Sequence, residues 1–158
     1  MQQPNQQPLY RVTGQLPRGF QGHIAYTTLL PEDLRALRIV FTFDKREPQQ
    51  DLEALHRDCL AAAAKNGVPV EGEFSGPLAQ RLCAMPKGEI NFSVFLNGAC
   101  VGSAHRNQLE KRVILAADGS SEGFVSCRPA GSVRVVLHVL NVLNDDTNYS
   151  LCLEGVYE

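Results

Sequence analysis

The longest strand pattern in the chain is VRVVLHVLNV, residues 133–142. Side chains along a strand point to alternate sides, so this segment presents two faces. One face carries Val133, Val135, Leu137 and Val139, and the other carries Val136, His138, Leu140 and Val142. Both faces are mostly apolar, which favours a central strand that is covered on each side.

Shorter strand patterns lie on both sides of this segment and are separated by turn residues. They cover residues 10–15, 20–28, 37–43, 89–96, 99–104, 109–117, 123–127 and 149–154. Asn97-Gly98 is a preferred pair for a two-residue hairpin, so the strands that flank it are expected to pair antiparallel. Eight or nine short strands spaced in this way predict a mainly β protein, an antiparallel β-sandwich of the jelly-roll type.

One segment has a strong helical pattern, about residues 49–66. Apolar residues recur there at helical spacing, at Leu52, Leu55 and Cys59, and four alanines follow. We expect this helix to be inserted between the early and the late strands and to lie against a sheet face or edge. After it, we expect residues 68–74 to be extended and residues 78–85 to form a short helix.

Length and composition limit the domain organisation and the partners. The chain has 158 residues and a mass of 17.4 kDa, enough for one domain with a sizeable core. We expect a disordered polar N-terminus over residues 1–8 and a single β-sandwich domain over residues 9–158. Fifteen Lys and Arg against 17 Asp and Glu leave a net charge of -2, which argues against nucleic acid and anionic membranes as partners.

The chain shows no sequence feature of export. The first eight residues, MQQPNQQP, have neither the basic nor the apolar region of a secretory signal. The longest apolar run, residues 59–64, is far shorter than the roughly 20 residues needed to span a bilayer. The five cysteines are odd in number and widely spaced, unlike the disulfide framework of a secreted domain. We therefore expect a soluble cytoplasmic protein.

Several short motifs lie together in the last part of the chain. They are Glu122-Gly123-Phe124, Pro129-Ala130-Gly131, the strand 133–142 and the return Tyr149-Ser150-Leu151. This set resembles the closing strands of accessory jelly-roll domains that accompany bacterial hydrolases. In such domains an aromatic residue is usual early in the long strand, where this chain has Val133. The resemblance implies a jelly-roll fold and a carbohydrate-binding or interaction role, with no catalytic residues to carry over.

Basic residues gather near one end of the predicted sandwich. His105, Arg106 and Arg112 are expected to line a loop end, where they can meet an anion or a carboxylated sugar, although solvated charges would look the same in the sequence. Tyr149 is the aromatic residue that we add to this candidate ligand site. Tryptophan is absent and aromatic residues make up 7% of the chain, which argues against a broad stacking platform.

A second candidate site lies in the loop between the last two strands. Residues 144–148 read Asn-Asp-Asp-Thr-Asn, and hard cations such as Ca²⁺ prefer oxygen ligands of this kind. Asp145 and Asp146 are the candidate metal ligands, and Ca²⁺ is the one cofactor considered. The glycine and the distal glutamate of an EF-hand loop are missing, and a plain turn favours the same residue types.

No catalytic motif is present. The G-x-S-x-G elbow, the phosphate-binding loops and the closely spaced ligand pairs of a zinc site do not occur. The sequence therefore favours a non-catalytic module that binds an unknown small molecule or a protein.

Two alternatives stay open. The first is a small hydrolase or a cupin-like metal enzyme that uses His56, His105 or His138 in a pocket of the sandwich. It requires at least two histidines near one point, together with a carboxylate or a cysteine. The second is a structural domain that forms a homodimer through an uncovered sheet face or an edge strand.

Overall fold

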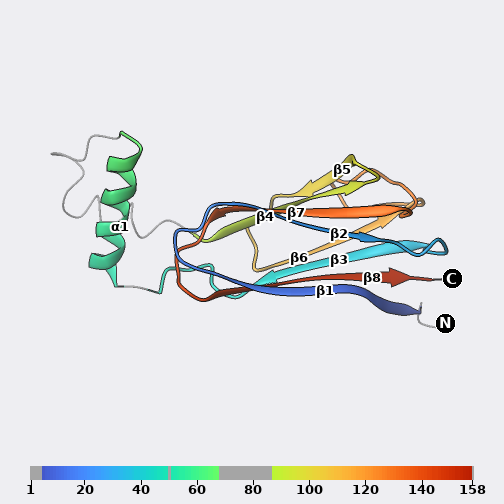
Figure 1. Ribbon diagram of the computed structural model, residues 1–158, viewed down its shortest axis with the longest axis horizontal. Coiled ribbons are helices and arrows are strands. Elements are labelled where there is room, and N and C mark those ends of the chain that lie inside the picture. The colour runs from blue at the N-terminus through green and yellow to red at the C-terminus, as the bar shows by residue number, and fades with distance from the viewer. Residues whose placement is uncertain (1–4, 50, 68–86, 158) are drawn as a thin grey trace.

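A computed structural model of the chain describes residues 5–49, 51–67 and 87–157, without the side chains of Leu52, Leu55 and His56. The described residues form eight strands and one helix (Figure 1). In chain order the elements are β1 (Gln6–Leu16), β2 (Gly22–Leu29), β3 (Ala36–Phe43), α1 (Leu52–Lys65), β4 (Glu89–Leu96), β5 (Ala99–Ala104), β6 (Glu110–Ala116), β7 (Ser132–Asn141) and β8 (Thr147–Val156).

The strands form two four-stranded antiparallel sheets that face each other (Figure 1). One sheet has the order β1-β8-β3-β6, and the other has the order β2-β7-β4-β5. The first strand pairs with the last, the second with the seventh, the third with the sixth and the fourth with the fifth. This order is that of a jelly roll, and it confirms the predicted antiparallel β-sandwich.

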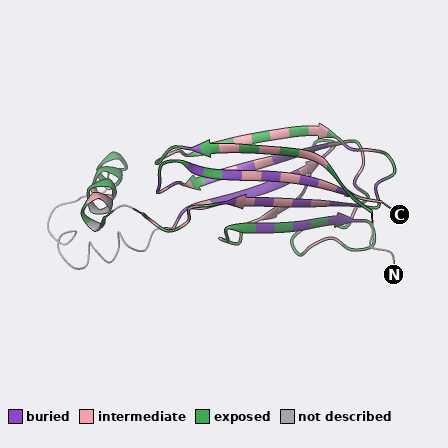
Figure 2. Ribbon diagram, turned by 90° about the horizontal axis from the view of Figure 1, so that it is seen from below, coloured by how far each residue is buried: buried purple, intermediate pink, exposed green. Residues whose placement is uncertain are grey.

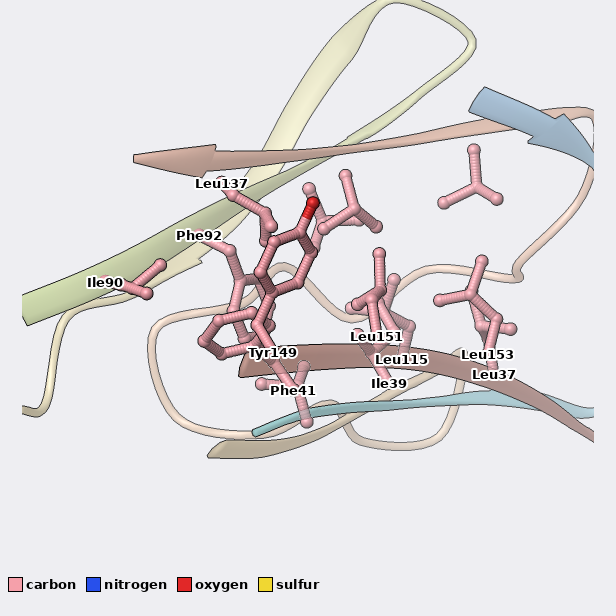
Figure 3. Packing of buried hydrophobic residues seen from close by; sticks show 14 of the residues in the cluster. Leu37, Ile39, Phe41, Ile90, Phe92, Leu115, Leu137, Tyr149, Leu151 and Leu153 are labelled. Atoms are coloured by element: carbon pink, nitrogen blue, oxygen red, sulfur yellow. The ribbon is translucent and has the colours of Figure 1, made fainter. Parts of the chain in front are cut away.

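The core lies between the two sheets and takes every second residue of the strands, so that buried and exposed positions alternate along them (Figure 2). Large side chains from both sheets meet there (Figure 3). The ring centroids of Phe41 on β3 and Phe92 on β4 are 6.2 Å apart, and both side chains are fully buried. Burial of such aromatic and aliphatic groups supplies most of the stability of a sandwich.

Strand β7 is central in its sheet, between β2 and β4, as the sequence predicts. Its inner face is buried at Val133, Val135, Leu137 and Val139. Along β7 its outer face is open, since Leu140 is 47% exposed and Val136 and His138 are half-buried. Val142, the fourth residue expected on this face, follows the end of β7 and is buried in the core. The prediction that both faces are covered is wrong, because apolar side chains on an open face can pack against their neighbours across the strands.

Helix α1 lies beyond one end of the sandwich (Figure 1). Asp51 caps its N-terminus, with the side chain accepting a hydrogen bond of 2.7 Å from the backbone N–H of Ala54. Arg18 of the β1–β2 turn forms an ion pair of 3.3 Å with Asp58. None of the helix side chains that the structure describes is buried. The predicted helix is therefore confirmed, but its predicted packing against a sheet face or edge is wrong.

Three further segments differ from the sequence prediction or lie outside the described residues. Strand β1 begins at Gln6, so part of the segment 1–8 that we expected to be disordered is in a sheet. Residues 123–127 contribute a single bridge, between Gly102 and Phe124, in place of the expected short strand. The predictions for residues 68–74 and 78–85 lie outside the described residues.

The two ends of the described chain lie side by side. Gln6 on β1 is opposite Val156 on β8, at the end of the sandwich away from α1 (Figure 1). In the described ranges, no helix is long and apolar enough to cross a membrane.

Candidate functional site

A groove of about 440 Å³ opens along the side of the sandwich where β5 and β6 form the edges of the two sheets. The β5–β6 connection and the loop after β6 contribute much of its wall. The groove is lined by Ser103, Ala104, His105, Arg106, Gln108, Lys111, Arg112, Val113, Ser121, Glu122, Gly123 and Phe124.

Lys111 is a charged residue on the inner face of β6. It alternates with exposed neighbours in the same way as Val113 and Leu115, so its side chain enters the core side of the sheet. The residue is 4% exposed. Its Nζ donates hydrogen bonds to the backbone oxygens of Ile90, at 2.5 Å, and Gln108, at 3.3 Å. An ammonium group has three N–H donors, and these two hydrogen bonds use two of them.

The charge of Lys111 is not neutralised by a contacting carboxylate. Among the described residues, no Asp or Glu forms an ion pair with its ammonium group. Burial lowers the pKa of Lys111 from 10.5 to about 8, an effect that Glu89 partly opposes and Arg46 increases. The rings of Phe41 and Phe43 lie 5.8 and 5.7 Å from Nζ, within the range of cation–π contacts, but they carry no counter-charge.

The rim of the groove brings together three residues of the ligand site that the sequence predicts. His105, Arg106 and Arg112 all line it, and all three are exposed. Arg106 pairs with Glu122 at 3.0 Å, and Arg112 pairs with Glu110 at 2.6 Å. These exposed pairs are weak, so both guanidinium groups can exchange a carboxylate of the chain for one of a ligand.

Tyr149, the fourth predicted member, does not belong to this groove. It is 7% exposed and lies in the core, and its hydroxyl is 2.5 Å from the hydroxyl of Tyr26. Burial and this hydrogen bond raise the pKa of Tyr149. We expected Tyr149 to be exposed and to stack on a ligand. It instead shares the inner face of β8 with Leu151 and Leu153, so its side chain lies in the core.

The loop with Asp145 and Asp146 serves to hold neighbouring segments together. The Nζ of Lys45 donates to the backbone oxygens of Asp145, at 3.0 Å, and Asp146, at 2.9 Å. The carboxylate of Asp145 accepts a hydrogen bond of 3.0 Å from the backbone N–H of Arg18. Nowhere in the described ranges do three His, Cys, Asp or Glu side chains gather as metal ligands. The ammonium group of Lys45 thus occupies two backbone oxygens of the loop, as in a structural turn, and Ca²⁺ binding by Asp145 and Asp146 stays a prediction.

A row of polar side chains crosses the outer face of the second sheet. Ser103 on β5 and Ser93 on β4 have their hydroxyl oxygens 2.7 Å apart. Ser93 Oγ is 2.7 Å from Nε2 of His138 on β7, and Nδ1 of His138 is 2.9 Å from Nδ1 of His23 on β2. We call these four residues the Ser–His row. It begins at Ser103 in the groove wall and takes one residue from each strand of the sheet.

The register of the strands explains the Ser–His row. His23 is directly opposite His138, and Ser93 is directly opposite Ser103. Burial lowers the pKa of His138, and the charges of His23 and His105 lower it further. The sequence alone does not reveal this row. Alternation alone places Ser93 and His138 on outward positions, but only the pairing of β2 with β7 brings His23 beside His138.

The histidine hypothesis required two histidines near one point with a carboxylate or a cysteine. The structure brings His23 and His138 together, whereas the hypothesis named His56, His105 and His138. His105 lies at the groove, and the side chain of His56 lies outside the described residues. No carboxylate or cysteine joins the His23–His138 pair in the described part of the chain.

Fold and site together define a jelly-roll β-sandwich with an open groove at one edge and a polar row beside it. Residues 6–156 match the model of a family of unknown function (DUF6669), and the chain belongs to this family. No curated protein matches the chain.

Proposed function

We propose that the chain is a non-catalytic binding module that holds a small anionic ligand, a carboxylate in the first place, in the groove between β5 and β6. The observation that carries this proposal is the buried ammonium group of Lys111, which has no carboxylate partner among the described residues. A buried charge without a counter-charge is unfavourable, and a bound anion would relieve it.

The surroundings of Lys111 support an anion in particular. Arg106 and Arg112 stand at the rim with His105, and the acidic residues Glu110 and Glu122 are each paired with one of these arginines. Glu89 acts on Lys111 through its charge without forming an ion pair with it. An incoming carboxylate can accept hydrogen bonds from a guanidinium group in a bidentate manner and from the ammonium group as a point charge. Phe124 and Val113 supply apolar surface for the rest of the ligand.

The test is a thermal-unfolding titration of the full chain with acetate, phosphate and glucuronate, and with glucose as the neutral control. A ligand at 100 times its Kd stabilises a native state by about 2.7 kcal/mol. We expect at least one anion to raise the Tm of the wild type while glucose does not. The absence of any anion-dependent shift would contradict the proposal.

Variants locate the binding. Lys111→Met removes the buried charge, and Lys65→Met, the same change on exposed α1, is the matched control. We expect Lys65→Met to keep the anion-dependent shift and Lys111→Met to lose it. If Lys111→Met does not fold, the double variant Arg106→Gln/Arg112→Gln tests the rim, since both residues are exposed. An unchanged shift in the double variant would place the anion elsewhere.

The cysteines support a reducing compartment, and we propose a cytoplasmic location. Cys100, Cys127 and Cys152 are not in a disulfide. The relation to accessory domains of bacterial hydrolases and the formation of a homodimer stay predictions. Light scattering at micromolar concentration tests the dimer directly.

A further inference from the structure

We propose that His23 and His138 form a two-histidine site for a divalent transition metal ion on the outer face of the second sheet, at residues that do not line the ligand groove. Neutral imidazole nitrogens are good ligands for Cu²⁺, Ni²⁺ and Zn²⁺ and poor ones for Ca²⁺ and Mg²⁺.

The distance between the two ring nitrogens fits such a site. Nδ1 of His23 and Nδ1 of His138 are 2.9 Å apart, and the two rings are nearly perpendicular at 84°. With bonds of about 2.0 to 2.1 Å, two nitrogen ligands of one metal ion lie roughly 2.9 to 3.3 Å apart for bond angles between square-planar and tetrahedral. The two nitrogens share a hydrogen bond, so one Nδ1 carries a proton in the metal-free chain. When the ion binds, that proton moves to Nε2 of the same ring, and the exposure of His23 lets the ion enter from solvent.

The strand pairing fixes the two ligands relative to each other. His23 on β2 and His138 on β7 are direct partners in an antiparallel ladder whose register is regular from Gly22 to Leu29. Side chains of direct partners on one face are held about 5 Å apart at Cβ. Because the paired strands hold both residues in place, binding of a metal ion costs little conformational entropy of the backbone.

The other nitrogen of His138 already has the partner that a metal ligand needs. Ligating histidines usually donate their second ring N–H to a fixed acceptor, which orients the ring. Ser93 Oγ stands 2.7 Å from Nε2 of His138, and Ser103 Oγ stands 2.7 Å from Ser93 Oγ. With the metal on Nδ1, the Nε2–H of His138 donates to Ser93, and the Ser93 hydroxyl donates to Ser103. Ser93 is therefore a positioning residue for this site.

Two protein ligands leave the remaining coordination positions to water. Affinity then follows the intrinsic preference of imidazole, and we expect Cu²⁺ to bind more tightly than Ni²⁺ or Zn²⁺.

The test is calorimetric titration of the full chain with Cu²⁺, Ni²⁺, Zn²⁺ and Mg²⁺, together with NMR of the histidine rings during addition of Ni²⁺ and Zn²⁺. We expect binding of the first three ions, with the His23 and His138 signals changing first. His23→Ala should abolish these changes, and Thr27→Ala, at another exposed position of β2, is the control that should keep them. Wild-type affinity in His23→Ala, or equal loss in Thr27→Ala, would overturn the assignment, as would the absence of binding.

Ser93→Ala tests the positioning role. Loss of an outer partner of this kind weakens metal affinity by about 10- to 100-fold. We also expect the ring ¹⁵N signals of metal-free His138 to change in Ser93→Ala, because Nε2 loses its partner. Unchanged affinity together with unchanged ring signals would show that Ser93 does not orient His138.

Discussion

The ring of Tyr149 on β8 lies directly over Gly14, its partner across the β1–β8 pair. A Cβ atom added to Gly14 would overlap Cζ, Cε1 and the hydroxyl oxygen of that ring. Glycine is therefore required here by the close approach of a buried aromatic side chain.

Gly14→Ala is expected to destabilise the protein, because the Tyr149 ring must move within a packed core. Overpacking of this kind costs about 1 to 3 kcal/mol. The free energy of unfolding in urea measures the loss. Thr13→Ala on the exposed face of the same strand is the control and should stay within about 0.5 kcal/mol of the wild type. Equal stability of the two variants would contradict the contact.

The hydrogen bond between the hydroxyl groups of Tyr26 on β2 and Tyr149 on β8 joins strands of different sheets. We therefore expect the two residues to be energetically coupled in the folded state. Each single Tyr→Phe change removes one partner and is expected to cost about 1 kcal/mol. The double variant should cost less than the sum of the singles, since the second change leaves no unpaired hydroxyl. A double-mutant cycle in urea measures this coupling, and strictly additive losses would argue against the hydrogen bond.

Lys111 should make stability depend on pH above neutrality. Its pKa is about 8 in the folded chain and near 10.5 in the unfolded chain, so between these values the unfolded state binds more protons. Stability from this group therefore rises as the pH increases from 8 towards 10.5. Cysteines and tyrosines titrate in the same range, so the measured quantity is the stability of the wild type minus that of Lys111→Met at each pH. A difference that does not rise with pH would contradict the burial of the charge.

Asp51→Ala should weaken α1 without weakening the sandwich. Loss of an N-cap typically costs about 1 kcal/mol of helix stability. Because α1 lies beyond the end of the sandwich, amide exchange should become faster in the helix only. Faster exchange in β3 and β4 as well would show that the helix and the strands unfold together. Glu53→Ala, in the same first turn, is the control for lost negative charge.

Strand alternation was sufficient to predict the fold, because inward positions such as Val135 and Leu151 are marked by their apolar character. The packing of α1 could not be predicted from the sequence. The helical spacing of its apolar residues is the same whether the helix packs against a sheet or stands apart from it. The same limit explains the outer face of β7, where Leu140 is apolar but exposed.

The candidate sites depended on contacts between distant segments. His105, Arg106 and Arg112 were found because they flank one predicted connection, and the groove joins them. Lys111 lies in the same stretch, and alternation places its side chain on the inner face of β6. This position indicates a ligand site only when β5 and β6 are known to be the edge strands beside the groove. His23 and His138 are 115 residues apart, and no local pattern predicts that they are partners.

The neighbouring positions of Gln6 and Val156 mean that the chain order is not essential to the architecture. A short peptide linker could join the present ends, and new ends could be opened in the connection between β3 and β4, near α1. Such a circular permutant would keep all six strand pairings of the sandwich. It would also place the new ends on the opposite side of the molecule, so that a fused reporter could be attached at either end of the sandwich.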